Sequence, residues 1–436
     1  MAGLLGRMLT GAKSAVFERG RLIYWLNIPS FRRSARRVNA KPRGEKIRVG
    51  FLLQVPNNWA VLQPVYEAAL ADDRVEPVVL LMPELEFFCY VKLTKVHWEK
   101  TYAFGAERFG ERAVRLWDAE KKTWMLPESL GLDYIFLPRP YETYLPFCWR
   151  ASALRRVTRV CFVPYSSPLL DDYCLMYNTH FIRNVNLIFC EKQHSYNSVS
   201  ARLKPTLRSG DQKVFNPGFP KFDDIPSGMG QESQVWPAPR RPGVLRVLWT
   251  PRWTLDARLG GTSFFRYREE MIRWAEEDAA VNLVFRPHPL ALETYVREGW
   301  MTAQERDAFL ALCEACPNAA VDRSSTYFDT FWSSDVLITD VSSMLMDYML
   351  TGKPILYCPT PAGNRFSDDP SLAIRPFLEG MYVVRSMEEI RERAEAIRRG
   401  EDPLKPAREK LAAEMRRTGH IGEDIIGLLK KDYFRE

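Results

Sequence analysis

The chain has 436 residues, of which 46% are hydrophobic and 26% charged, a composition typical of soluble globular proteins rather than disordered or membrane-spanning ones. Because one hydrophobic core rarely serves so long a chain, we expect two domains. The net charge of +7 is uneven, since residues 1–46 carry eleven Lys/Arg and two Glu, whereas the other 390 residues carry 50 basic and 52 acidic groups. The near-neutral body offers no basic field for nucleic acid, so no nucleic-acid partner is expected.

The basic N-terminal segment mixes apolar and cationic residues. Residues 1–27 intersperse apolar side chains with arginine and lysine, and a polybasic run containing Arg32, Arg33, Arg36 and Arg37 follows. This amphipathic, basic composition predicts that residues 1–46 contact an anionic membrane surface. A packed or solvated tail and a nucleic-acid arm are the alternatives.

The cysteines and the N-terminus indicate the compartment. Eight cysteines are scattered, mostly within apolar stretches, as is typical of reduced and buried thiols. Cys313 and Cys316 have CxxC spacing but no second pair, and no metal site is expected. With no clean apolar signal region at the N-terminus, we expect a cytoplasmic protein, peripheral at the inner face of the cell membrane.

The remaining chain alternates strands and helices. In the first half, strands are predicted at 47–54, 75–82, 134–138, 159–164 and 185–190, with a helix at 64–70. In the second half, strands are predicted at 246–250, 281–286, 319–321, 336–338 and 355–357, with helices at 264–277, 292–316 and 344–350. This alternation predicts an α/β fold with open parallel sheets. We assign 47–215 and 216–385 to two Rossmann-like domains, 224–243 to a loop or linker, and 386–436 to C-terminal helices.

Residues 333–357 form the most informative segment, a strand, a polar loop, a helix and a second strand. The loop contains Thr339, Asp340, Ser342 and Ser343, and Asp347 lies one turn further on. Small polar residues at a helix start suit a phosphate, because unpaired backbone N–H groups lie there. Simple capping of the helix by Asp340 or Ser342 is the alternative.

Three other segments end strands with residues that suit a diphosphate. NPGFPKFD contains Gly218, which permits a close backbone approach, while VLWTPRW presents Arg252 and VFRPHP presents Arg286 and His288. No P-loop motif occurs, and no GxGxxG follows the first strand, which disfavours ATPases and dinucleotide dehydrogenases. A nucleotide is therefore expected at the carboxyl ends of the second half's strands, with the acceptor entering across a cleft.

These four segments resemble the CDP-glycerol glycerophosphotransferase family, the teichoic-acid polymerases and their relatives. NPGFPKFD is similar to a GxPRxD segment, VLWTPRW to a YaPTwR strand, VFRPHP to an iikxHP strand, and residues 333–357 to sDxLITDYSSxxfDyxllxKPiifY. The resemblance covers residues 160–357. It implies a GT-B fold with two Rossmann-like domains, a cleft between them, and metal-independent transfer from a cytidine diphosphate donor.

The resemblance also implies roles for individual residues. His288 would assist phosphate departure, and Ser342, Ser343 and Asp347 would bind the donor, with Arg252 and Arg286 nearby. Gly218, Thr339 and Asp340 complete the donor-binding candidates. Members of the family act at the cytoplasmic membrane face on lipid-linked acceptors, in agreement with the basic N-terminal segment.

One family motif is missing. The polymerases carry a Trp-His-Gly motif whose histidine serves as base for the acceptor hydroxyl, but residues 162–170 contain no histidine. Asp171 is our candidate catalytic base, and Asp172, His180 and His194 are alternatives.

The sequence thus predicts a transferase for surface-polysaccharide synthesis. It would move a phosphopolyol, by resemblance glycerol phosphate, from a CDP-activated donor to a glycan or lipid-linked acceptor, without a cofactor. Two alternatives stay open: a GT-B glycosyltransferase that uses a nucleotide sugar, and a non-catalytic scaffold of the same pathway.

Overall fold

The computed structural model describes residues 21–39, 45–88, 92–166, 176–177, 179–223, 232–255, 261–324, 327–342, 344–360, 375–416 and 419–435. The chain forms two compact units. Unit 1 comprises Met1–Ser166, Asp172–Asp223 and Thr418–Glu436, and unit 2 comprises Ser167–Asp171 and Asp224–Arg417. Of the candidate site residues and alternative bases, Asp171, Asp172 and Ser343 lie outside the described residues.

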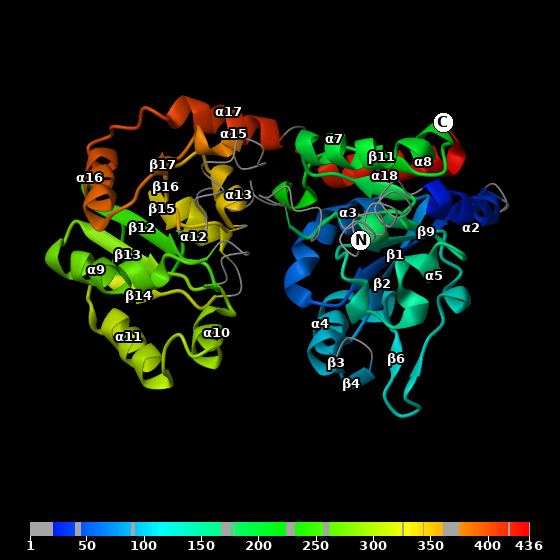
Figure 1. Ribbon diagram of the computed structural model, residues 1–436, viewed down its shortest axis with the longest axis horizontal. Helices are drawn as coiled ribbons and strands as arrows, with labels where there is room; N and C mark the ends of the chain where they lie inside the picture. Colours follow the sequence, from blue (N-terminus) through cyan, green and yellow to red (C-terminus); the bar gives the residue numbers. More distant parts are fainter. Residues whose placement is uncertain are drawn as a thin grey trace, which may run out of the picture. The chain divides into compact units, whose positions relative to one another are not determined.

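Unit 1 contains a seven-stranded parallel sheet in the order β11-β10-β9-β8-β1-β2-β5 (Figure 1). Its strands are β1 (Ile47–Leu53), β2 (Val75–Leu81), β5 (Ala113–Arg115), β8 (Tyr134–Leu137), β9 (Arg159–Phe162), β10 (Leu187–Phe189) and β11 (Lys213–Phe215). Two antiparallel hairpins are added, β3 (Glu84–Phe88) with β4 (Lys92–His97), and β6 (Trp117–Asp118) with β7 (Thr123–Trp124). Its α-helices are α2 (Arg21–Asn39), α3 (Trp59–Ala71), α4 (Glu99–Phe109), α5 (Ala151–Leu154), α6 (Thr179–Ile182), α7 (Gln193–Arg202), α8 (Lys204–Arg208) and α18 (Ile421–Phe434).

Unit 2 contains a six-stranded parallel sheet in the order β14-β13-β12-β15-β16-β17. Its strands are β12 (Leu245–Thr250), β13 (Val281–Phe285), β14 (Ala319–Val321), β15 (Val336–Thr339), β16 (Ile355–Tyr357) and β17 (Tyr382–Val383). Its helices are α9 (Phe264–Glu277), α10 (Ala291–Arg297), α11 (Ala303–Ala315), α12 (Phe328–Ser333), α13 (Met344–Met349), α15 (Arg375–Leu378), α16 (Met387–Arg398) and α17 (Lys405–Arg416).

The strands β12, β13 and β15 of unit 2 are buried along their whole length because helices cover both faces of the sheet (Figure 1). Along β12, Val247 and Trp249 pack into one core with Phe264 of α9, whereas Leu248 packs into a second core with Leu345 of α13. Successive side chains of a strand point to opposite faces, so one strand serves both cores. Both units have the predicted parallel α/β architecture.

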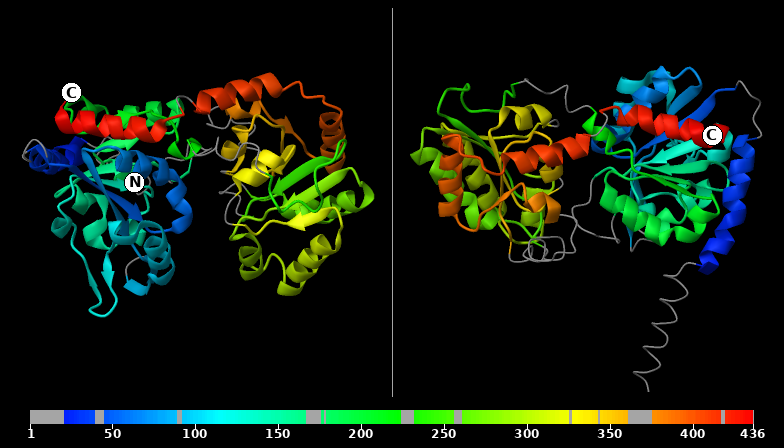
Figure 2. Two further views of the ribbon diagram at one scale, coloured as in Figure 1. Left: turned by 180° about the vertical axis from the view of Figure 1, so that it is seen from behind. Right: turned by 90° about the horizontal axis from the view of Figure 1, so that it is seen from above.

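The C-terminal helix α18 belongs to unit 1, where it packs on α3 (red in Figure 2). The Asp223 carboxylate accepts a hydrogen bond from the backbone N–H of Gly422 at 2.7 Å, which fixes the start of this helix. Consequently residues 216–223, which we assigned to the second domain, group with unit 1. The expected C-terminal segment 386–436 is likewise divided between the units.

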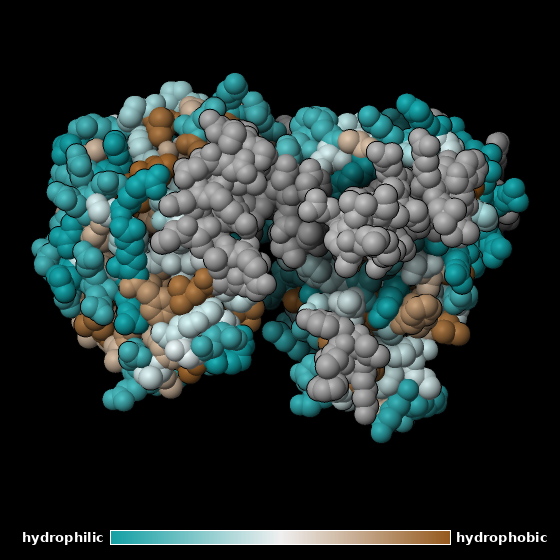
Figure 3. Space-filling view, in the orientation of Figure 1, coloured by the Kyte–Doolittle hydropathy of each residue, from teal (hydrophilic) through white to brown (hydrophobic). Residues whose placement is uncertain are grey.

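Helix α2 also packs on unit 1, against β9, α8 and α18. Its residues Ile28, Phe31 and Val38 are buried, as the alternative of a packed tail expected. The apolar side chains of residues 1–27, on which the membrane prediction depends, lie outside the part of the structure that is described. Among the described helices, none is both long enough and apolar enough to cross a bilayer. On the face drawn in Figure 3, the coloured hydrophobic residues form small groups among hydrophilic ones.

Candidate functional site at the carboxyl edge of unit 2

The order of strands in unit 2 reverses next to β12. The two strands that follow it, β13 and β14, lie on one side, whereas β15, β16 and β17 lie on the other. In open parallel sheets, ligands bind at the carboxyl ends of the strands where such a reversal occurs. Arg252 follows β12 and the loop 339–342 follows β15, so the sequence candidates flank this point.

Asp340 ties the loops of the site together. Its side chain is completely buried, and Oδ1 accepts a hydrogen bond from the backbone N–H of Arg252 at 2.8 Å. Oδ2 accepts hydrogen bonds from the backbone N–H and the hydroxyl of Ser263 at 2.7 and 2.9 Å. Burial raises the pKa of Asp340 to about 6, and the hydrogen bonds from Ser263 act against that rise. Both carboxylate oxygens are therefore engaged inside the protein, and they position the loop after β12 and the start of α9.

Arg252 is a half-buried cation whose Nε donor is buried. One Nη1–H donates to the carbonyl of Val341, while the backbone carbonyl of Arg252 accepts from the hydroxyl of Tyr295. Burial lowers the pKa of Arg252, and the charge of Asp340 partly restores it. Its Nε is buried without a hydrogen-bond partner among the described residues. Because an unpaired buried donor costs free energy, a ligand oxygen at this position would be stabilising.

Trp249 of β12 pairs with Phe285 of β13. Arg252 follows Trp249 by three residues and His288 follows Phe285 by three, so the two side chains belong to neighbouring strand ends. His288 Nδ1 accepts a hydrogen bond from the backbone N–H of Leu290 at 3.1 Å, which places the proton of the neutral ring on Nε2. Burial and the positive charge of Arg252 lower its pKa to about 4. At neutral pH, His288 is thus an uncharged Nε2–H donor.

Arg286 is committed to neighbouring groups. Its Nη1 forms an ion pair with Asp322 at 2.5 Å and a hydrogen bond with the Ser324 hydroxyl at 3.1 Å. The guanidinium carbon stands 5.3 Å from the ring centre of Tyr327, whose hydroxyl donates to Asp347 at 2.6 Å. Arg286 and Asp347 therefore belong to one network through Tyr327, and both are largely buried.

The hydroxyls of the loop after β15 make local contacts. Thr339 is fully buried, and its Oγ1 donates to the carbonyl of Thr250 at 2.8 Å, which ties β15 to β12. The hydroxyl of Ser342 accepts from the backbone N–H of Met344, the first residue of α13, at 3.3 Å. Ser342 thus caps α13 in the way that the alternative interpretation expected.

Gly218 is the one described donor candidate that belongs to unit 1. It follows β11 with a φ of +116°, a conformation that favours glycine. Of the alternative bases, His180 lies 3.4 Å from the carboxylate of Glu142, and a hydrogen bond with Glu142 raises its pKa. His194 lies exposed near the start of α7.

A cavity of about 450 Å³ opens beside β13 and β14. Arg286, His288 and Ser324 line it together with Glu293 and Arg306 of α10 and α11. Arg306 pairs with Glu293 at 2.8 Å, so its charge is already compensated.

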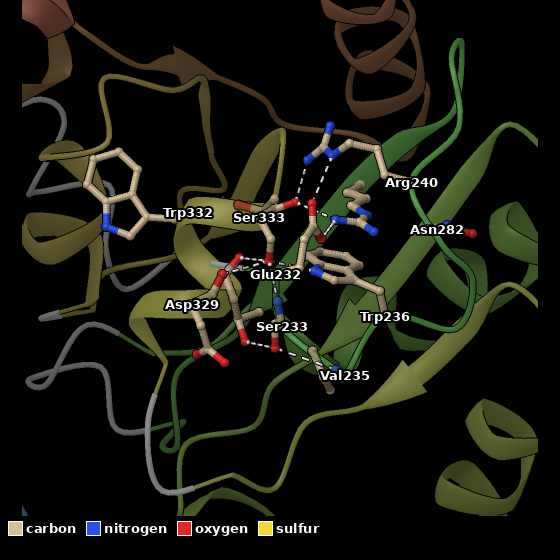
Figure 4. Close-up of polar contacts among 12 residues, drawn as sticks. Glu232, Ser233, Val235, Trp236, Arg240, Asn282, Asp329, Trp332 and Ser333 are labelled. Atoms are coloured by element: carbon tan, nitrogen blue, oxygen red, sulfur yellow. Dashed lines mark hydrogen bonds and ion pairs between the residues drawn. The ribbon is translucent and has the colours of Figure 1, made fainter. Parts of the chain in front are cut away.

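A second polar network occupies the opposite, amino-terminal end of the sheet (Figure 4). There Trp236 donates to the Ser333 hydroxyl at 2.8 Å, Arg246 pairs with Glu232, and Arg240 donates to the Ser333 carbonyl at 2.6 Å. These contacts hold residues 232–240 of the expected linker against unit 2. Arg246 Nε is buried without a hydrogen-bond partner among the described residues, but the other contacts named here join groups within the network, which suits a structural role.

Sequence reasoning missed two residues of the site, Ser263 and Tyr295. Ser263 directly precedes the predicted helix 264–277, so its position as a helix cap was the available signal. Tyr295 lies within α10, and its contact with Arg252 had no local signature.

The comparisons with known proteins concern the family and the fold. Residues 178–361 match the model of the CDP-glycerol:poly(glycerophosphate) glycerophosphotransferase family. No curated protein sequence is a significant relative.

Solved structures share the fold. A UDP-GlcNAc 2-epimerase from Neisseria meningitidis bound to UDP-GlcNAc is 14% identical with a TM-score of 0.57, and the match covers 88% of this chain and 100% of that chain. A putative UDP-N-acetylglucosamine 2-epimerase from Listeria monocytogenes is 11% identical with a TM-score of 0.55, over 90% of this chain and 98% of that chain.

The wall teichoic acid polymerase TagF is 13% identical with a TM-score of 0.51, over 100% of this chain and 98% of that chain. At these identities the likeness concerns the fold alone, and it confirms the predicted pair of Rossmann-like domains of the GT-B type. Residues 178–361, which contain the carboxyl-edge residues of unit 2 described above, match the model of the CDP-glycerol:poly(glycerophosphate) glycerophosphotransferase family, the family that the sequence motifs resemble.

Proposed function

We propose that this protein transfers glycerol phosphate from CDP-glycerol to a hydroxyl of a glycan or lipid-linked acceptor in surface-polysaccharide synthesis. The observation that carries the proposal is the position of His288 and Arg252 at the strand reversal of unit 2, each three residues beyond the paired Phe285 and Trp249, so that the charge of Arg252 acts on His288. Both residues lie within the segment that matches the family. His288 is a neutral N–H donor, and Arg252 is a half-buried cation whose Nε has no hydrogen-bond partner among the described residues. Both types of group suit a diphosphate.

The proposed reaction is a substitution at the phosphorus that carries glycerol. The acceptor hydroxyl oxygen forms a bond to that phosphorus. At the same time the bond between the phosphorus and the bridging oxygen of the diphosphate breaks. CMP leaves with the electron pair, and the hydroxyl proton passes to a base. We propose Asp171 as this base, because it directly follows the segment where the family has its Trp-His-Gly histidine.

His288 suits the role of stabilising the departing CMP. As a neutral imidazole it donates Nε2–H to a phosphate oxygen, and the negative charge that develops there strengthens this hydrogen bond. A bound anion also raises the pKa of His288 from its low value in the free protein, since it favours the imidazolium form.

The contacts divide the other candidates into two groups. We propose that Arg252, Ser342 and Ser343 touch the donor, and that Gly218 permits a close backbone approach. The other four candidates form hydrogen bonds or ion pairs with protein groups, which supports a role in holding the loops in place. They are Thr339, Asp340, Arg286 and Asp347.

We further propose that α2 attaches the protein to the anionic inner face of the membrane, where lipid-linked acceptors occur. Arg33, Arg36 and Arg37 are exposed, and no ion pair is found for them among the described residues, whereas Phe31 and Val38 of the same helix are buried. This arrangement supports an electrostatic contact with headgroups through the arginine face. Each such cation contributes about 1 kcal/mol at an anionic surface.

The nucleotide that is released tests the reaction class. The full-length protein is mixed with a membrane extract and, in separate reactions, with CDP-glycerol, CDP-ribitol and a panel of UDP-sugars. CMP from CDP-glycerol supports the proposal. A nucleoside diphosphate released from a sugar donor would instead establish a glycosyltransferase, and no release from any donor would favour a scaffold.

A further inference from the structure

Unit 1 has a strand reversal of its own, next to β1. The strands β2 and β5 lie on one side of β1, and β8, β9, β10 and β11 lie on the other. The same rule that locates the site of unit 2 therefore points to the loops after β1 and β8. Phe51 pairs with Phe136 across these strands, and three residues further on each strand are Gln54 and Arg139.

Gln54 and Arg139 are in contact at this edge. Arg139 Nη1 donates to Gln54 Oε1 at 3.0 Å. The Gln54 amide nitrogen donates to the carbonyls of Pro83 and Tyr144 at 3.0 and 2.8 Å, which turns the amide oxygen toward Arg139. Gln54 is buried, and its side-chain oxygen and nitrogen both form hydrogen bonds. The partner of the Arg139 guanidinium is therefore a neutral amide.

The charge of Arg139 has no carboxylate partner among the described residues. Its Nε is buried without a hydrogen-bond partner there. The guanidinium carbon stands 5.4 Å from the ring centre of Tyr141 and 5.9 Å from that of Tyr144, and these contacts hold the cation in place without neutralising it. The hydroxyls of Tyr141 and Tyr165 lie 3.2 Å apart at the same edge.

We propose that Arg139 binds a phosphate group of the acceptor, with the hydroxyls of Tyr141 and Tyr165 as further donors. A guanidinium fork matches two phosphate oxygens, and a neutral glutamine partner leaves its full charge available to them. The proposal rests on the proposed function, since a chain that accepts glycerol phosphate carries phosphodiesters and a lipid-linked acceptor carries a diphosphate. Either source presents the same chemistry to Arg139.

The test measures equilibrium binding of two probes to the full-length protein by calorimetry. One probe is a synthetic glycerol-phosphate trimer and the other is a short-chain prenyl diphosphoryl sugar. Arg139→Gln should raise the Kd of at least one probe by about tenfold or more, and Arg139→Lys should raise it less, because lysine keeps the charge but not the fork. The probe that responds identifies the source of the phosphate.

Arg74→Gln is the matched control. Arg74 also stacks on an aromatic ring, that of Phe434 at 5.0 Å, but it precedes β2 at the opposite edge of the same sheet. Its Kd values should stay within about twofold of the wild type. Three results would overturn the proposal. Arg139→Gln could bind both probes with unchanged Kd, the wild type could bind neither probe, or Arg74→Gln could lose as much probe affinity as Arg139→Gln.

CDP-glycerol binding to the same variants separates this inference from the proposed function. Arg139→Gln should leave the Kd of CDP-glycerol within about twofold of the wild type. An equal loss of donor binding would make Arg139 a donor residue and overturn its assignment to the acceptor. If the wild type turns over no CDP-glycerol while the probes still require Arg139, the proposed reaction fails and the phosphate site stands. Thermal melting curves establish that each variant is folded.

Discussion

The imidazole of His288 accepts a hydrogen bond from the backbone N–H of Leu290, two residues further along the chain, at 3.1 Å. This contact directs Nε2–H away from the backbone, and the neighbouring charge of Arg252 disfavours a second proton on the ring. The histidine is thereby prepared to donate one hydrogen bond to an anion.

The pH dependence of His288 follows directly. Burial and Arg252 lower its pKa from 6.5 to about 4, so the folded protein binds fewer protons than the unfolded chain between these values. The contribution of His288 to stability therefore falls as the pH drops from 6.5 toward 4. NMR of labelled histidines, with His288→Asn to assign the signal, should show this ring neutral at about pH 5, and added CDP should raise its midpoint. A midpoint at the ordinary histidine value in the free protein would contradict the structure.

Asp340→Asn should loosen the loops of the site. An asparagine offers one acceptor oxygen, and its NH₂ group would face an N–H of either Arg252 or Ser263. We expect a loss of about 1–3 kcal/mol in the free energy of unfolding, measured with urea, and a higher KM for the donor. The exposed substitution Asp307→Asn is the control.

The stability difference between the wild type and Asp340→Asn should depend on pH. The folded pKa of Asp340, about 6, lies above its ordinary value of 3.8, so the wild type loses stability as the pH rises between them and the variant does not. The deficit of the variant should therefore shrink from acid to neutral pH, and a deficit that grew would contradict the assigned pKa.

Two glycines of α18 form a matched pair. A Cβ on Gly422 would stand 2.4 Å from the carbonyl oxygen of Pro64, whereas one on Gly427 meets nothing within 4 Å. Gly422→Ala should destabilise the protein by about 1–3 kcal/mol because backbone would have to move. Gly427→Ala should be neutral or stabilise by up to about 1 kcal/mol, since alanine favours helix. Equal melting temperatures for the two variants would show that α18 does not pack as described.

The arginine face of α2 predicts salt-sensitive membrane binding. Replacing Arg33, Arg36 and Arg37 with glutamine should weaken co-sedimentation with vesicles that contain phosphatidylglycerol, by about tenfold or more. Binding of the wild type should fall with added salt, because the contact is electrostatic. Replacing Lys121, Lys122 and Arg112 serves as a control of equal charge change. If the control weakened binding equally, net charge rather than this face would account for it.

Local patterns predicted the fold well. The expected strand 336–338, helix 344–350 and strand 355–357 correspond to β15, α13 and β16 within a residue or two, because apolar runs and Gly352 mark their ends. Residues 292–316, expected to be largely helical, form the two helices α10 and α11. The sequence also placed Arg252 and His288 at strand ends, from which a parallel register brings them together.

Local sequence patterns could not predict hydrogen bonds between residues that lie far apart in the chain. The bonds from Ser263 to Asp340 join residues 77 positions apart, and that from Arg139 to Gln54 joins residues 85 positions apart. Whether Asp340 faces a ligand or the protein depends on which distant N–H groups meet it, and no local pattern records that. The packing of α2 on unit 1, which buries Phe31 and Val38, stayed an open alternative for the same reason, since an amphipathic segment fits a membrane or a protein surface equally well.

The most direct test compares the rate of CMP release from CDP-glycerol, with membrane extract as acceptor, for the wild type, His288→Ala and His97→Ala. His97 is exposed on the β3–β4 hairpin of unit 1, so its variant should keep the rate within about twofold. His288→Ala should lower kcat/KM by about 100- to 1,000-fold, because one donor to the departing phosphate is lost. Equal rates in all three proteins would contradict the assignment of the carboxyl edge of unit 2 as the site of transfer.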